Sequence, residues 1–117
     1  MISIERAYSK QPSKEGKRFL VDRIWPRGIK KEQLDLDGWL KEVAPTNQLR
    51  RWFGHDPEKW EAFQQRYHKE LDAHPEAWQP LLEEARQGDV ILIYGARDTE
   101  HNQAVALKAY LDKKLKV

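Results

Sequence analysis

The sequence predicts one α/β domain over residues 1–117, with a small, mostly parallel sheet of about three strands flanked by helices and a large helical insertion between the second and third strands. Three observations predict this class. Short segments typical of strands lie at residues 2–6, where apolar and polar side chains alternate, and at the apolar runs 19–21 and 90–94. Between the second and third of these segments, apolar side chains recur at helical spacing, with helix start and stop signals among them. A further amphipathic segment follows the last of the three.

The three strands are predicted to have different surroundings. Residues 2–6 alternate apolar and polar side chains, as a strand with one solvated face does. Residues 19–21 are uninterrupted and expected in the centre of the sheet, and residues 90–94 are typical of a strand covered on both faces. The polar residues 8–17 predict an exposed loop. Its length is about the minimum for a parallel crossover, so strand order stays open and an antiparallel first pair is an alternative.

The helical insertion is predicted to begin shortly after residue 34. Asp35 or Asp37 is expected to cap a first helix that contains Trp39 and Val43. Pro45 is expected to end that helix, because proline lacks the N–H that the helix interior needs.

Three more helices are predicted in the insertion. Thr46 is expected to cap one, which ends at Gly54, where a left-handed residue is favoured. Asp56-Pro57-Glu58 combines a cap, a first-turn proline and a first-turn acid, and is the clearest helix start in the chain. Pro75 opens the last of the three, which Pro80 is expected to kink or split.

A final helix is predicted after the third strand. Thr99 or Asp98 is expected to cap it, and Leu107 and Leu111 belong to its apolar stripe.

Composition and charge limit the classes of function. The chain has no cysteine, which excludes disulfides, thiol nucleophiles and thiolate metal sites. No apolar run approaches the ~20 residues of a membrane span, and residues 1–6 lack the core of a signal peptide. We therefore expect a soluble cytoplasmic protein with no membrane attachment.

The formal net charge of +2 conceals a gradient along the chain. Residues 1–34 carry nine Lys/Arg against four Asp/Glu, residues 35–89 carry seven against twelve, and residues 90–117 carry five against three. The basic segments therefore lie at the two ends of the chain, and a site that they share would attract anions. Charges spread over a solvated surface are the alternative.

Each basic segment holds one polar cluster directly after a predicted strand, at residues 22–28 and 94–102. In open parallel sheets, ligands bind beyond the carboxyl ends of the strands. If these two strands are parallel neighbours, both clusters open at the same edge of the sheet. The sequence therefore predicts an anion-binding site there.

The second cluster supplies candidate catalytic and binding residues. His101 is the candidate acid/base, with Asp98 beside it, because a histidine near neutral pH transfers protons readily. Arg97 is expected to bind a phosphate or carboxylate, with Tyr94 and Asn102 as further ligand contacts. The alternative is structural: Asp98 caps the helix, His101 packs against the sheet, and Tyr94 is buried.

The first cluster supplies candidate anion ligands. Arg23 and Arg27 are expected to clamp an anion, with Trp25 as a flat wall or stacking face and Gly28 allowing the turn. The alternative is that Arg23 pairs with Asp22 and Trp25 belongs to the core.

Other recognised sites are not predicted. No His, Asp or Glu spacing matches a metal site, and no phosphate-cradling glycine loop or nucleophile elbow is present. We therefore expect neither a metal nor a cofactor. His55 is expected to pack against Trp60 ahead of its helix, with a place in the site as the alternative.

Four motifs in order, residues 21–28, 39–45, 49–57 and 94–102, resemble the YeaO-like branch of the bacterial domain-of-unknown-function family 488. The resemblance covers nearly the whole chain and implies a small cytoplasmic α/β domain without an established activity. Longer relatives carry a Cys-His-Arg sequence after the corresponding strand. Here that position has only the histidine, His101, so thiol chemistry does not carry over.

Two hypotheses for function follow. In the first, the protein binds, or acts on, a small anionic, phosphate- or nucleotide-like ligand at the carboxyl edge of the sheet. In the second, it is a nucleic-acid-binding or regulatory module whose basic N-terminal third tracks a phosphate backbone while Trp25 stacks on a base. The small net charge disfavours the second. The sequence predicts no oligomeric state.

Overall fold

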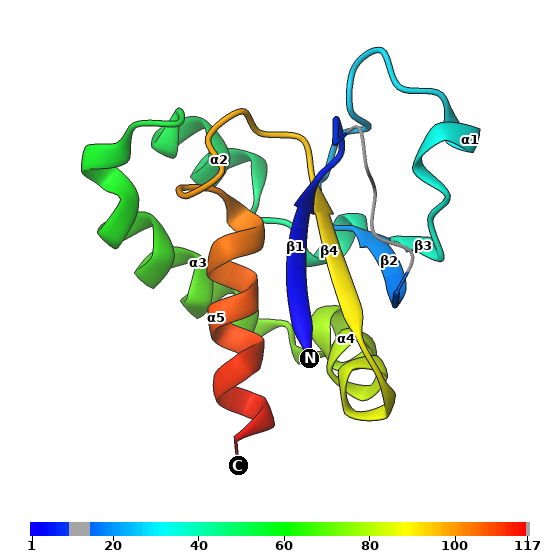
Figure 1. Ribbon diagram of the computed structural model, residues 1–117. Coiled ribbons are helices and arrows are strands. Elements are labelled where there is room, and N and C mark those ends of the chain that lie inside the picture. Colours follow the sequence, from blue (N-terminus) through cyan, green and yellow to red (C-terminus); the bar gives the residue numbers. More distant parts are fainter. Residues whose placement is uncertain (10–14, 117) are drawn as a thin grey trace.

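The computed structural model describes residues 1–9 and 15–116, and in this part of the chain four strands form one sheet (Figure 1). They are β1 (Ile2–Arg6), β2 (Lys17–Leu20), β3 (Gly38–Trp39) and β4 (Val90–Tyr94), in the order β1-β4-β2-β3. Every pairing is parallel, and β4 lies between β1 and β2. The predicted α/β class with a parallel sheet is confirmed, and the antiparallel alternative for the first two strands is wrong.

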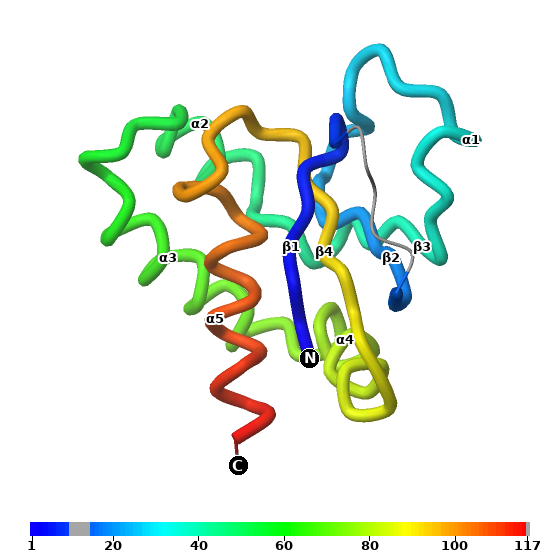
Figure 2. Tube along the Cα trace, viewed as in Figure 1, coloured from blue at the N-terminus to red at the C-terminus, as the bar shows by residue number. Residues whose placement is uncertain are grey.

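Helices cover the sheet on both faces. They are α1 (Lys31–Leu34), α2 (Asn47–Phe53), α3 (Trp60–Ala73), α4 (Pro75–Gln87) and α5 (Gln103–Leu115), with 3₁₀ turns η1 (Lys41–Val43) and η2 (Pro57–Lys59). Helices α3 and α5 pack together on one side of the sheet, and α1 lies on the other (Figure 1). The connection from β4 to α5 arches over one edge of the sheet, near α2 (Figure 2).

The apolar core has two parts because successive side chains of β4 point to opposite faces. Leu92 packs with the side chains of α2 to α5, whereas Ile91 and Ile93 pack with Leu20 and Leu34 on the face that α1 covers. All five residues of β4 are buried, as the sequence predicts for a strand covered on both faces.

The prediction of one helix that contains Trp39 and Val43 is wrong. Trp39 belongs to the edge strand β3 and pairs with Leu20, and Asp35 ends α1 in a left-handed conformation instead of starting a helix. Asp37 explains the difference. Its carboxylate accepts from the Arg18 N–H at 2.8 Å, and its own N–H donates to the Arg18 carbonyl at 2.8 Å, so the chain pairs with β2.

Most of the other start and stop signals are confirmed. Thr46 accepts from the third N–H of α2, and Gly54 ends that helix with φ of 54°. Asp56 accepts from the Glu58 N–H, although the first turn is the 3₁₀ helix η2 and α3 follows it. Helix α4 begins at Pro75 and continues through Pro80 without being split.

Among the described residues, no helix combines the length and apolar character needed to cross a membrane.

Truncation of Leu107 tests how much the helical face of the core contributes. Leu107 on α5 is fully buried, so Leu107→Ala should lower the free energy of unfolding by about 2–5 kcal/mol, measured by urea denaturation. Leu115→Ala, in the partly buried last turn of the same helix, is the matched control and should be clearly less destabilising. Equal losses in the two variants would contradict this packing.

Candidate functional site

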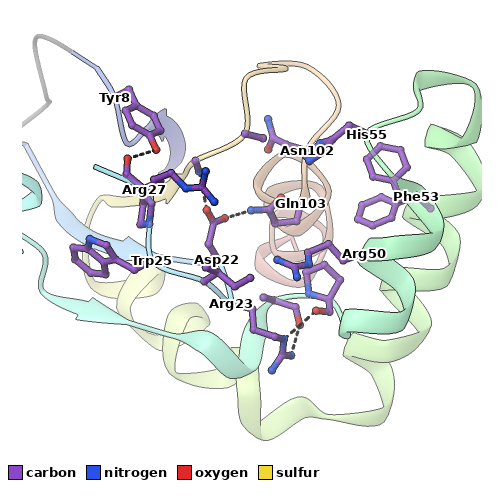
Figure 3. A pocket seen from close by; sticks show the side chains of 17 residues that line it. Tyr8, Asp22, Arg23, Trp25, Arg27, Arg50, Phe53, His55, Asn102 and Gln103 are labelled. Carbon is purple, nitrogen blue, oxygen red and sulfur yellow. Dashed lines mark hydrogen bonds between the residues drawn. The ribbon is translucent and has the colours of Figure 1, made fainter. Parts of the chain in front are cut away.

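The ends of β2 and β4 meet at one edge of the sheet, as the parallel pairing requires. Asp22, just past β2, accepts a hydrogen bond from the Gly95 N–H at 2.8 Å, and Gly95 directly follows β4. The other oxygen of Asp22 accepts from the side-chain amide of Gln103, the first residue of α5 (Figure 3). One carboxylate at the end of β2 therefore joins the end of β4 and the start of α5, both more than 70 residues later in the sequence.

A cavity of about 330 Å³ opens at this edge, and we call it the edge cavity. Trp25, Phe53 and Phe63 contribute aromatic walls, and Phe53 stacks on Phe63 with ring centroids 4.3 Å apart. The ionisable side chains around it are drawn together in Figure 3. They come from the segments after β1 and β2, from α2 and from the turn that follows α2: Tyr8, Asp22, Arg23, Arg27, Arg50 and His55.

Asp22 has unusual electrostatics for a carboxyl group. Burial raises its pKa from 3.8 to about 6, and this effect is larger than the opposing ones. The hydrogen bond from Gly95, the positive charge of Arg50 and the hydrogen bond from Gln103 all favour the ionised form. Asp22 is thus mainly ionised at neutral pH but takes up a proton in mildly acidic solution.

The cations around the edge cavity are not equivalent. Arg23 donates from Nε to the Pro45 carbonyl at 3.3 Å and from Nη2 to the Ala44 carbonyl at 3.2 Å, so it holds the chain ahead of α2. In contrast, the guanidinium groups of Arg27 and Arg50 make no hydrogen bond or ion pair with any residue that the structure describes. These two side chains are available to a ligand, and Arg23 is largely occupied.

Trp25 and Gly28 have clear structural roles. The indole N–H of Trp25 donates to the Ile29 carbonyl at 2.7 Å, and its ring packs edge-on against Trp39 with centroids 5.2 Å apart. Trp25 therefore belongs partly to the core and partly to the cavity wall. Gly28 has φ of 80°, which suits glycine in the turn, but it does not line the edge cavity.

Asn102 caps α5, and the expectation that Asp98 or Thr99 does so is wrong. The Asn102 side chain accepts from the Val105 N–H at 3.1 Å and donates to the Asp98 carbonyl at 2.9 Å. The asparagine amide can donate and accept a hydrogen bond at the same time. The Asp98 carboxylate instead accepts from Glu100 and His101 within the loop before α5. Asn102 lines the edge cavity, but its amide is already bonded on both sides.

Tyr94 is buried at the end of β4 and does not line the edge cavity. Burial raises the pKa of its hydroxyl. Arg97 is exposed and also lies outside the lining.

The predicted catalytic pair lies beside the edge cavity but does not line it. The Asp98 carboxylate contacts Nδ1 of His101 at 2.9 Å and accepts from the backbone N–H groups of Glu100 and His101. These hydrogen bonds hold the pKa of Asp98 below its usual value. The His101 ring packs edge-on against Trp60. A cap at Asp98 or Thr99 would place His101 in the first turn of the final helix. In the structure His101 precedes Asn102, the cap of α5, and so lies outside the helix.

Sequence reasoning missed several polar lining residues, among them Tyr8, Arg50 and Gln103, and it gave His55 a place in the site only as an alternative. His55 has a left-handed backbone, with φ of 58°, and its ring lies nearest that of Phe53, 6.2 Å away. Arg50 and Arg51 are adjacent on α2, and no periodic pattern in the sequence indicates which of the two faces the cavity. Asp22 carried a usable signal, since an acid directly after an inner parallel strand lies where ligands bind. In the described residues, no three His, Cys, Asp or Glu side chains are placed to hold a metal.

The burial of Asp22 predicts a specific pH dependence of stability. Its pKa is 3.8 in the unfolded chain and about 6 in the folded protein, so between these values the folded state binds more protons. Stability should therefore fall as pH rises through this range. Between about pH 4 and about pH 6, the free energy of unfolding of the wild-type protein should fall by on the order of 3 kcal/mol relative to that of Asp22→Asn. Urea denaturation at several pH values measures this difference. A difference that stays constant with pH would contradict a buried, titrating carboxyl.

The chain is similar to proteins of unknown activity. Uncharacterized protein YeaO of Escherichia coli (strain K12) is 37% identical over 110 residues, which cover 94% of this chain and 96% of YeaO. Uncharacterized protein Rv3073c of Mycobacterium tuberculosis (strain ATCC 25618 / H37Rv) is 43% identical over 70 residues, or 60% of this chain and 59% of the relative. No solved structure matches the chain.

The family profile described as "Inactive DUF488-N3 subclade" matches residues 1–117. This match and the nearly end-to-end alignment with YeaO confirm the resemblance that the four sequence motifs carry. The chain therefore belongs to the inactive DUF488-N3 subclade.

Proposed function

We propose that this protein is a cytoplasmic binding protein for a small anionic, phosphate- or nucleotide-like ligand, which occupies the edge cavity at the carboxyl ends of β2 and β4. The observation that carries the proposal is the pair of unpaired guanidinium groups, Arg27 and Arg50, on the walls of one cavity. Guanidinium groups form strong, often paired hydrogen bonds with phosphate oxygens. The absence of cysteine suits the reducing cytoplasm.

The charge around the edge cavity favours an anion. Three arginines, Arg23, Arg27 and Arg50, line it against one carboxylate, Asp22. The positive excess attracts an anion at long range, and the partly apolar walls strengthen the interaction once water is displaced.

The size and walls of the edge cavity favour a small molecule. Its volume of about 330 Å³ lies at the lower end of the 300–1,000 Å³ that is typical of small-molecule sites, roughly the size of a phosphorylated metabolite. The stacked rings of Phe53 and Phe63 and the indole of Trp25 supply flat apolar surfaces. A phosphate held by Arg27 and Arg50 would leave these surfaces to a base or another apolar group.

The proposal is for binding without a chemical step. The description of the subclade as inactive supports this choice, as does the lack of cysteine at the position where longer relatives carry Cys-His-Arg. A catalytic role for His101 and Asp98 stays a sequence-based prediction, to which the geometry of the edge cavity adds no support, because neither residue lines it.

Removal of either free guanidinium should weaken anion binding. An arginine–phosphate hydrogen bond contributes about 1.5–3 kcal/mol, so Arg27→Ala and Arg50→Ala should each weaken phosphate or nucleoside monophosphate binding by about ten- to a hundredfold. Ligand-induced shifts in thermal unfolding and titration calorimetry measure the effect. Arg51→Ala is the matched control, because Arg51 is on the same helix but does not line the edge cavity.

A nucleic-acid-binding module remains the alternative function, and one observation favours it. A second hollow of about 320 Å³ is lined by Arg23, Arg50 and Arg51 together with the exposed Ile24, so cations continue outward from the edge cavity. A phosphate-backbone binder loses affinity steeply as salt rises, whereas a pocket with two contacts does not. In the titrations above, a steep salt dependence and an equal loss in Arg51→Ala would favour nucleic acid over the proposed small ligand.

A further inference from the structure

Asp22 creates an apparent conflict within the edge cavity. Its carboxylate lines the cavity that Arg27 and Arg50 make attractive to anions. An ionised carboxylate close to a bound anion repels it, most strongly where water is excluded. The repulsion disappears if one proton lies between Asp22 and the ligand.

The hydrogen bonds of Asp22 leave room for that proton. One carboxylate oxygen accepts from the Gly95 N–H and the other from the Gln103 amide. Each carboxylate oxygen can accept two hydrogen bonds, so one position on each remains. A ligand O–H group can donate to such a position, and a protonated Asp22 can instead donate to a ligand oxygen.

The other charged or titratable groups near Asp22 are few. Arg23 follows it in the chain, Arg50 faces it from α2, and Tyr67 on α3 interacts with it electrostatically. Arg27 and His55 line the same cavity, with Tyr8 after β1. Burial keeps Tyr67 protonated at all relevant pH values, and the arginines stay charged. His55 is the histidine of the cavity lining, so its contribution needs a control of its own.

We propose that Asp22 makes the edge cavity selective for oxyanions that carry a proton, namely inorganic hydrogenphosphate and phosphate monoesters in their singly protonated form, over oxyanions that carry none, such as sulfate. This inference rests on the proposed function of the cavity. The ligand P–O–H group donates to the Asp22 carboxylate while Arg27 and Arg50 bind the remaining phosphate oxygens. Sulfate has no proton to donate near neutral pH, so it binds only when Asp22 itself is protonated.

The two anions should therefore respond differently to pH. Asp22 has a pKa of about 6, so between about pH 5 and about pH 7 the protonated fraction falls about tenfold. Sulfate affinity for the wild-type protein should fall by the same factor, because sulfate needs that proton. Phosphate affinity should change much less, since both of its forms in this range carry a proton.

Titration calorimetry with inorganic phosphate and with sulfate, at both pH values, tests the proposal on the wild-type protein without any variant. Asp22→Asn should bind the two anions alike and without the tenfold fall for sulfate, because asparagine is uncharged and has an N–H to donate. His55→Gln is the control for the histidine in the cavity lining and should keep the wild-type discrimination between the two anions.

The outcomes separate this inference from the proposed function. Equal phosphate and sulfate affinity at about pH 7, both reduced by Arg50→Ala, would overturn the role of Asp22 and leave the anion site intact. Discrimination that persists in Asp22→Asn, or that His55→Gln abolishes, would also overturn it. If neither anion binds the wild-type protein at either pH, the proposed function fails and this inference fails with it.

Discussion

The hydrogen bonds of the partly buried Asp22 carboxylate are the interactions on which the candidate site depends. This carboxylate accepts from Gly95 after β4 and from Gln103 at the start of α5, so it fixes where two strand ends and one helix meet. The same carboxylate lies in the wall of the cavity that these elements enclose. One polar side chain therefore sets both the geometry of the carboxyl edge and the charge within it.

This arrangement carries an energetic cost. Burial of an ionised group destabilises the folded state unless opposite charges and hydrogen bonds compensate. The charge of Arg50 and the two hydrogen bonds offset the burial of Asp22 only in part, as its raised pKa shows. An apolar residue would remove this cost, but it would also remove both hydrogen-bond acceptors. Incomplete compensation is typical of groups placed for ligands, where electrostatics are set for binding and not for stability alone.

The sequence predicts those features that are coded locally. The apolar run of β4 and the caps at Thr46 and Asp56 each depend on a few adjacent residues, and all are present as predicted. The strand at Trp39 is different. A two-residue strand has no periodicity to detect, and its pairing depends on contacts of Asp37 with Arg18 that no local pattern reveals.

The candidate site was predictable in its location but only partly in its membership, since Arg23, Trp25, Arg27 and Asn102 line the edge cavity whereas Tyr94, Arg97 and His101 do not. The convergence of residues 22–28 with the end of β4 follows from parallel pairing, and the structure shows it. Which side chains face the cavity depends on helix orientation. Arg50 enters from α2, whereas Arg97 is exposed in the loop before α5, which begins at Gln103, several residues later than the sequence indicates.

A crystal structure of the protein soaked in phosphate would test the central claim most directly. We expect one phosphate in the edge cavity, within hydrogen-bond distance of the guanidinium groups of Arg27 and Arg50 and with one oxygen facing the Asp22 carboxylate. An empty edge cavity at a saturating phosphate concentration, or phosphate bound only at Arg97 outside it, would contradict the account.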